Sequence, residues 1–205
     1  MQLLLASNNA KKLAELERIL AGLGITFVLP RDAGGLPDVL EDAPSFAGNA
    51  AKKAAAAALA RGLWALADDS GLLVDALDGA PGVLSARFAG VHGDDAANNA
   101  LLLQKLAGVP PERRGARFVC ALALARPDGS IALQVQGTAR GRILERPRGT
   151  RDFGYDPLFL FTEPGCAQSE RGFAELEPEE KAEVSHRGRA LREFARRLPG
   201  VLRGD

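Results

Sequence analysis

The sequence is poor in the residues that bind metals through nitrogen or sulfur and that form disulfide bonds. Its 205 residues include two cysteines, Cys120 and Cys166, and two histidines, His92 and His186. Neither pair has the spacing of metal ligands, and two cysteines cannot build a disulfide framework. These shortages argue against a zinc site and against a disulfide-stabilised secreted scaffold.

Long apolar runs and an excess of charge of one sign are also missing. Runs such as residues 54–60 are far shorter than a membrane span, and residues 1–6 lack the basic flank and the length of a signal peptide. Lys plus Arg number 26 and Asp plus Glu also number 26, so the net charge is zero. We therefore expect a cytoplasmic protein that binds neither a membrane nor nucleic acid, and that holds any polyanion by a local cluster of cations.

What the sequence does contain is an alternation of short apolar strands and helical patterns. Strands are predicted at residues 2–6, 25–29, 63–67 and 72–74, helices at 11–23, 45–61, 96–106 and 178–198, and a hairpin at 116–125 and 131–138 around Pro-Asp-Gly-Ser. This order predicts an α/β fold with a mixed sheet. Because no linker or repeat interrupts it, we expect a single domain over residues 1–205.

A polar turn follows the first predicted strand and precedes the first predicted helix. It reads Ser7-Asn8-Asn9-Ala10-Lys11-Lys12. A helix N-terminus offers unpaired N–H groups and a partial positive charge, which suit a phosphate, and Lys12 adds a full charge. The alternative is an ordinary N-cap with solvent-exposed lysines.

Two adjacent carboxylates, Asp68 and Asp69, interrupt the third apolar strand and are followed by Ser70. At the end of a parallel strand they would stand where α/β proteins usually bind ligands. Mg²⁺ is held by one or two carboxylates together with substrate phosphate oxygens. An acidic turn without function is the alternative.

Two further segments carry groups suited to a nucleotide. Lys181 and Ser185 lie four residues apart in the predicted last helix and are expected to share a face that His186 and Arg187 continue. In residues 153–157, Phe-Gly-Tyr-Asp-Pro, two aromatic rings could stack on a base. The alternatives are a solvated basic helix face and a core turn.

Together these segments resemble the non-canonical purine nucleoside triphosphate pyrophosphatases, also called inosine triphosphate pyrophosphatases. Six motifs, which span nearly the whole chain, appear in order: Ser7-Asn8-Asn9-x-x-Lys12, Phe46-x-x-Asn49-Ala50-x-x-Lys53-Ala54, Ala67-Asp68-Asp69-Ser70-Gly71-Leu72, Pro81-Gly82-Val83-x-Ser85-Ala86-Arg87, Phe153-Gly154-Tyr155-Asp156-Pro157-x-Phe159 and Ser185-His186-Arg187. The sequence departs from the family pattern at Gly48, where an acidic residue is frequent, and at Asn8, where some members carry Gly.

The resemblance implies an elongated mixed sheet flanked by helices, with two lobes around a central substrate cleft, and usually a homodimer. It implies Mg²⁺-dependent hydrolysis of ITP, dITP and XTP to the monophosphate and pyrophosphate, which cleanses the nucleotide pool of deaminated purines. A regulator that binds nucleotides without catalysis, or an enzyme of the same fold acting on other nucleotides, are the rival readings.

The resemblance also assigns roles to residues. Glu41 and Asp69 would bind the metal, and Asp69, assisted by Asp68, would activate the attacking water. The substrate would be bound by the remaining motif residues: Ser7, Asn8, Asn9, Ala10, Lys11, Lys12, Lys53, Ser70, Phe153, Gly154, Tyr155, Asp156, Lys181, His186 and Arg187.

Overall fold

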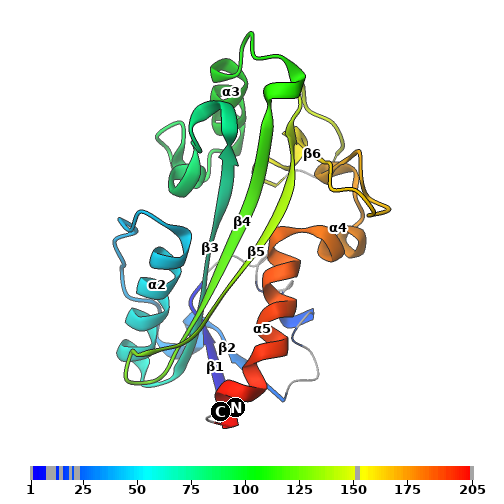
Figure 1. Ribbon diagram of the computed structural model, residues 1–205. Helices are drawn as coiled ribbons and strands as arrows, with labels where there is room; N and C mark the ends of the chain where they lie inside the picture. Colours follow the sequence, from blue (N-terminus) through cyan, green and yellow to red (C-terminus); the bar gives the residue numbers. More distant parts are fainter. Residues whose placement is uncertain are drawn as a thin grey trace. The chain divides into compact units, whose positions relative to one another are not determined.

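The computed structural model describes residues 2–7, 13, 16–18, 20, 24–150 and 153–203 (Figure 1). Its strands form one seven-stranded sheet in the order β2-β1-β3-β4-β5-β6-β7. The strands are β1 (Gln2–Leu5), β2 (Thr26–Val28), β3 (Trp64–Val74), β4 (Gly115–Ala125), β5 (Ile131–Ile143), β6 (Phe159–Phe161) and β7 (Arg171–Gly172). β1 pairs in parallel with β2 and β3, whereas β6 pairs antiparallel with β5 and β7. The predicted α/β fold with a mixed sheet is therefore confirmed, and the sheet is open.

The longer helices with described bounds are α2 (Phe46–Arg61), α3 (Asp95–Lys105), α4 (Pro178–Val184) and α5 (His186–Arg203). Short 3₁₀ helices cover Pro30–Ala33, Asp75–Leu77, Gly82–Arg87, Pro111–Arg113, Asp156–Leu158 and Phe173–Glu175. Within the predicted helix 11–23, the described residues Leu13, 16–18 and Leu20 are helical. Among the described helices, none has the length and hydropathy that crossing a bilayer requires.

The chain divides into two compact units, each with its own hydrophobic core. The first comprises residues 1–69, 120–137 and 187–205, and the second comprises residues 70–119 and 138–186. One core is built entirely from residues of the first unit and the other entirely from residues of the second. That the whole chain is one domain stays a prediction.

In the first unit, strand alternation sorts large and small side chains onto opposite faces. Along β4, Cys120, Leu122 and Leu124 belong to the core with Leu191 and Phe194 of α5. The alternate residues Ala121, Ala123 and Ala125 are equally buried but point to the other face. That face carries α2, because Gln134 Nε2, between the core residues Leu133 and Val135 of β5, donates to the Ala47 carbonyl oxygen at 3.1 Å.

Helix α2 is matched to this alanine face. Its buried positions are mostly small, since Ala50, Ala54, Ala57 and Ala58 accompany Phe46 and Asn49. Ser45 caps its start by accepting from the Gly48 N–H at 3.1 Å, and Gly62, at a φ of 63°, ends it in the left-handed conformation that glycine favours. Short side chains on both sides let the helix backbone lie close to the strands.

Two predicted boundaries are wrong. The carboxylates do not end a strand, because β3 runs without interruption from Trp64 to Val74. Its parallel partner β1 ends at Leu5, opposite Leu66, but β4 continues along the other side and supplies the pairing that a turn would have lost. Conversely, the predicted helix 178–198 is two helices. Ser185 breaks it with an extended backbone (ψ 153°) and directly precedes α5, where serine is a favoured cap.

A buried arginine organises the end of α3 in the second unit. Arg114 is 5% exposed and donates three hydrogen bonds to main-chain carbonyl oxygens: Nη2 to Leu106 at 2.8 Å, Nε to Val109 at 3.0 Å and Nη1 to Leu144 at 3.0 Å. The guanidinium thus caps the carbonyl end of α3 and ties it to the segment after β5.

We expect Arg114→Met to lower the free energy of unfolding by about 3 kcal/mol, because three carbonyl groups lose their donor. Urea denaturation measures this. Arg113→Met is the matched control, since Arg113 is exposed and is expected to change stability by less than about 0.5 kcal/mol. Equal midpoints for the two variants would contradict the capping role.

Candidate active site

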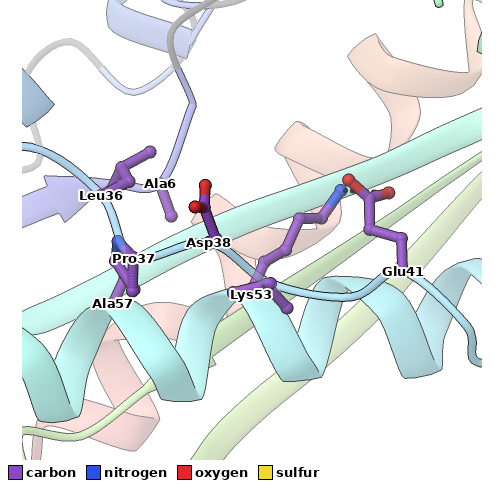
Figure 2. A pocket seen from close by; sticks show the side chains of 8 residues that line it. Ala6, Leu36, Pro37, Asp38, Glu41, Lys53 and Ala57 are labelled. Atoms are coloured by element: carbon purple, nitrogen blue, oxygen red, sulfur yellow. Dashed lines mark hydrogen bonds and ion pairs between the residues drawn. The ribbon is translucent and has the colours of Figure 1, made fainter.

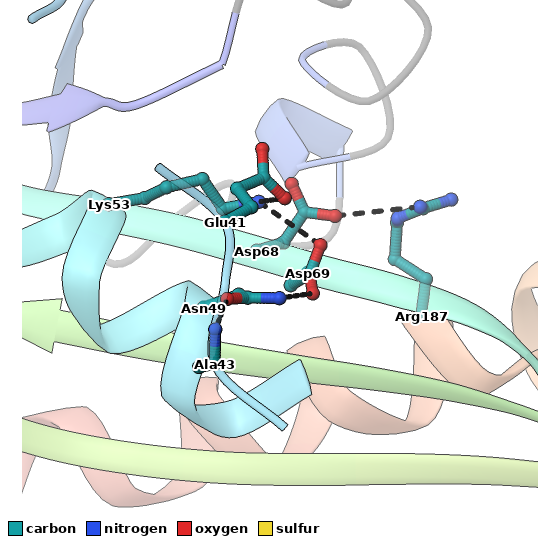
Figure 3. Close-up of polar contacts among 7 residues, drawn as sticks. All are labelled: Glu41, Ala43, Asn49, Lys53, Asp68, Asp69 and Arg187. Atoms are coloured by element: carbon teal, nitrogen blue, oxygen red, sulfur yellow. Dashed lines mark hydrogen bonds and ion pairs between the residues drawn. The ribbon is translucent and has the colours of Figure 1, made fainter. Parts of the chain in front are cut away.

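Three charged side chains of the first unit meet beside β3 (Figure 3). The Lys53 ammonium of α2 lies 3.2 Å from Glu41 Oε2 and 3.1 Å from Asp69 Oδ1. The Lys53 and Asp69 side chains are 18% and 13% exposed, so the lysine lies between two carboxylates in a largely desolvated setting. The structure thus brings three predicted site residues together, whereas their functional roles stay predictions.

Asn49 completes the surroundings of Asp69 and is missing from the predicted site. It is fully buried, its Oδ1 accepts from the Ala43 N–H at 2.9 Å, and its Nδ2 donates to Asp69 Oδ2 at 3.3 Å. Both oxygens of Asp69 therefore have a donor. Asn49 and Lys53 lie one turn apart on α2, and a single amide four residues before a lysine in an alanine-rich helix is the signal that could have identified it.

The Asp68 side chain pairs with a different helix from that of Asp69. Its Oδ2 lies 3.6 Å from Arg187 Nη2 of α5, and the two side chains are 5% and 9% exposed. Successive residues of a strand point in opposite directions, so the neighbouring carboxylates pair with residues of different helices. Each is neutralised by a cation from a different helix, as Figure 3 shows.

The protein environment shifts the pKa of both members of the Lys53–Asp69 pair. Burial raises the pKa of Asp69 above its ordinary value, and this outweighs the opposing effect of the Lys53 charge. For Lys53, burial acts against the charged form, but the carboxylates of Asp69, Asp68 and Glu41 together raise its pKa. The charged form of the lysine is thus favoured, and Asp69 accepts a proton more readily than a solvated aspartate.

The first unit holds a pocket of about 270 Å³ at this cluster (Figure 2). It is lined by Ala6, Leu36, Pro37, Asp38, Val39, Glu41, Lys53 and Ala57. One wall is the loop 36–41 and the other is α2. The loop is anchored before the pocket by Arg61, whose Nε donates to the Gly35 carbonyl at 3.0 Å, and after it by the ion pair of Asp42 with Lys52. Asp38, an exposed carboxylate in this lining, was not predicted.

The residues present fit a magnesium ion. Within the described part of the chain, no three His, Cys, Asp or Glu side chains gather as a complete metal-binding set. Mg²⁺ does not need one, because it keeps several waters and uses one or two carboxylates plus phosphate oxygens. Glu41 and Asp69 both reach the same Lys53 nitrogen, so their carboxylates converge on a single positive charge.

In the second unit, the segment from Phe153 to Asp156 forms a turn whose acid is paired. Lys181 of α4 forms an ion pair with Asp156, whose side chain is 5% exposed. The Lys181 nitrogen also lies 5.7 Å from the ring centroids of Phe153 and Phe173. Tyr155 is a core residue: its ring is buried and its hydroxyl donates to the Ser85 carbonyl at 2.9 Å. Of the two aromatic rings, only Phe153 is partly exposed.

The four predicted residues at the C-terminal segment do not share one helix face. Because Ser185 ends α4, Lys181 belongs to one helix and Arg187 to the next, and they contact different acids, Asp156 and Asp68. His186 stacks on Phe118 with centroids 4.7 Å apart and planes at 12°. The prediction of a common face is therefore wrong, whereas the ligand roles stay predictions.

Of the predicted phosphate-binding motif at residues 7–12, the structure describes Ser7. Ser7 follows β1 and its N–H donates to the Leu5 carbonyl at 2.8 Å, and Ser70 lies within β3. Asn8, Asn9, Ala10, Lys11 and Lys12 lie outside the described residues, so their predicted contact with phosphate stays a prediction.

Comparison with known proteins gives a consistent result. The model of the Ham1 family matches residues 3–197. The dITP/XTP pyrophosphatase of Corynebacterium efficiens is 51% identical over 196 residues, which cover 94% of each chain. Among solved structures, a HAM1 protein from Coxiella burnetii has a TM-score of 0.87 and 40% identity, covering 97% of this chain and 98% of that one.

A second solved structure, a nucleoside-triphosphatase / dITP/XTP pyrophosphatase from Mycobacterium abscessus, has a TM-score of 0.78 and 50% identity, covering 95% of this chain and 98% of that one. The family model, the sequence relatives and the folds thus agree over nearly the full length, which confirms the resemblance seen in the motifs. The chain belongs to the Ham1 family.

Proposed function

We propose that this protein hydrolyses non-canonical purine nucleoside triphosphates, dITP, ITP and XTP, to the monophosphate and pyrophosphate. Relatives that are 51% and 49% identical to this chain carry the name dITP/XTP pyrophosphatase. The observation that carries the proposal is the Lys53 ammonium held between Glu41 and Asp69 at the edge of a pocket. A cation can neutralise charge on the phosphate chain, and carboxylates can orient the attacking water and hold a metal ion.

In the proposed reaction, water attacks the α-phosphorus and the bridging oxygen leaves with pyrophosphate. Asp69 orients the water and takes up its proton, and the raised pKa of Asp69 suits that task. Asn49 holds the second oxygen of Asp69 and so fixes the direction of the carboxylate. Lys53 neutralises charge on the phosphate chain, with Lys12 predicted to assist it.

Glu41 and Asp69 are the residues proposed to hold Mg²⁺. When bound, the ion would neutralise phosphate oxygens and lower the pKa of a coordinated water. Arg187 of α5 forms an ion pair with the buried Asp68 carboxylate at 3.6 Å.

Base selection is proposed to rest on donors that face the 6-oxo group of hypoxanthine or xanthine, among them His186 and Lys181. Adenine carries an amino donor at that position and would leave such groups unpaired, at a cost of about 1–3 kcal/mol for each. The homodimer that the resemblance implies and the cytoplasmic location expected from the sequence composition stay predictions.

A substrate panel tests the reaction. We expect pyrophosphate release from dITP, ITP and XTP to exceed release from GTP, ATP and dUTP, to require Mg²⁺, and to fall at least about a hundredfold in Asp69→Asn, because the base and a metal ligand are weakened together. Asp32→Asn, an exposed carboxylate outside the pocket lining, is the control. Release of single phosphates or indifference to the base would overturn the chemistry. If no substrate released any phosphate product, the result would favour a protein that binds nucleotides without hydrolysing them.

Lys53 and Lys52 offer a matched pair of neighbours. Lys53 pairs with Glu41 and Asp69 inside the site, whereas Lys52 pairs with the exposed Asp42. We expect Lys53→Met to lower kcat/KM for ITP about a hundredfold or more and Lys52→Met to change it less than about twofold, since one exposed ion pair contributes little. Steady-state kinetics of the two variants decide this. Equal effects would remove Lys53 from the proposed machinery.

Metal binding can be measured without turnover. With Mn²⁺ as the probe, titration calorimetry or electron paramagnetic resonance should show Glu41→Gln binding the ion at least about tenfold more weakly than the natural protein, because a charged ligand is lost. Asp42→Asn, one residue further along the same loop and paired with Lys52, should bind as the natural protein does. Undiminished binding in Glu41→Gln would contradict the assignment of Glu41.

A further inference from the structure

Two side chains of helix α3 form hydrogen bonds with the main chain of Gly154, in the turn that begins at Phe153. The Gly154 N–H donates to Asp95 Oδ2 at 2.8 Å, and the Gly154 carbonyl accepts from Asn99 Nδ2 at 2.8 Å. Asp95 and Asn99 lie one turn apart on α3, so their side chains project from the same face. No motif of the sequence pointed to either residue.

Gly154 has a conformation that needs such support. Its φ of +57° lies in the left-handed region that favours glycine, and nothing lies within 4 Å of where a Cβ would be. The glycine is therefore required by the backbone and not by crowding. The open side of the turn leaves room for a ligand to approach the main chain closely.

The other flank of the turn is fixed as well. The Tyr155 hydroxyl donates to the Ser85 carbonyl, and Ser85 Oγ in turn donates to the Gly82 carbonyl at 2.6 Å and accepts from the Leu72 N–H at 2.9 Å. The Asp156 N–H closes the turn on the Phe153 carbonyl at 3.1 Å. The turn is thus held by hydrogen bonds on both sides, to α3 on one and to this network on the other.

The Asn99 amide leaves one buried acceptor without a donor from the described residues of the protein, which packing alone does not explain. Only its nitrogen can donate to the Gly154 carbonyl, so the orientation of the amide is determined. Its Oδ1 is buried, and among the residues the structure describes no donor reaches it. A buried acceptor left without a partner destabilises the folded state, so a residue chosen for stability alone would differ here.

We propose that Asp95 and Asn99 are positioning residues that set the nucleobase selectivity of the turn from Phe153 to Asp156. The inference rests on the proposed function and adds α3 to it. Because both groups of Gly154 are bonded to α3, Gly154 itself does not read the base. It fixes the angle at which the Phe153 ring and the Asp156–Lys181 pair meet a purine.

The test compares Asn99→Ala and Asp95→Ala with Asp95→Asn, whose amide oxygen still accepts from Gly154, and with Gln104→Ala, an exposed residue of the same helix. For each, kcat and KM are measured with ITP and ATP, together with inhibition by inorganic tripolyphosphate, which has no base. Thermal melting shows which variants are folded.

We expect Asn99→Ala and Asp95→Ala to raise KM for ITP about tenfold and to reduce the preference for ITP over ATP about as much, the effect of one lost hydrogen bond. kcat and the inhibition by tripolyphosphate should change less than about threefold, Asp95→Asn should restore most of the loss, and Gln104→Ala should match the natural protein. If Asp95→Ala does not fold, Asn99→Ala and Asp95→Asn carry the test.

Two results would overturn the proposal. One is an unchanged KM and ITP preference in folded Asn99→Ala. The other is a loss of tripolyphosphate inhibition equal to the loss for ITP, which would mean a general structural defect. Failure of the proposed function is distinguishable, because the natural protein itself would then release no pyrophosphate.

Discussion

The arrangement of charged side chains in the first unit depends on the alternating directions of Asp68 and Asp69 along β3. Two adjacent carboxylates on one surface would repel each other and would have to face water. Inside a strand they point to opposite faces, so each can be largely buried beside its own cation, Asp69 with Lys53 and Asp68 with Arg187. One carboxylate is thereby paired with Lys53 beside the pocket, and the other with Arg187 at the start of α5.

Both units hold a polar group in the same way, by a pair of side chains one helical turn apart. On α2, Asn49 and Lys53 hold the two oxygens of Asp69. On α3, Asp95 and Asn99 hold the two main-chain groups of Gly154. A helix fixes the spacing of such a pair rigidly, so the bonded carboxylate or peptide inherits the rigidity of the helix.

Sequence patterns predicted the mixed α/β fold because apolar periodicity and turn residues are local signals. These patterns did not predict features that depend on contacts between segments distant in the sequence. Asp-Asp-Ser-Gly is a turn signal, yet pairing with β4 keeps it in β3. Ser185 has no proline or glycine beside it to announce a break. Asp95 and Asn99 act on a glycine more than fifty residues away, a contact no spacing rule contains.

The alanine face between α2 and the strands has a consequence for how this protein can change. Only glycine is smaller than alanine, so nearly every substitution at these positions inserts a larger side chain and must lengthen the distance between the helix backbone and the strands. Lys53 is carried on that helix, and its reach to Asp69 follows the gap. A larger residue at one of these alanine positions touches no ligand, yet it is expected to change the distance from Lys53 to Asp69 and, with it, the proposed activity.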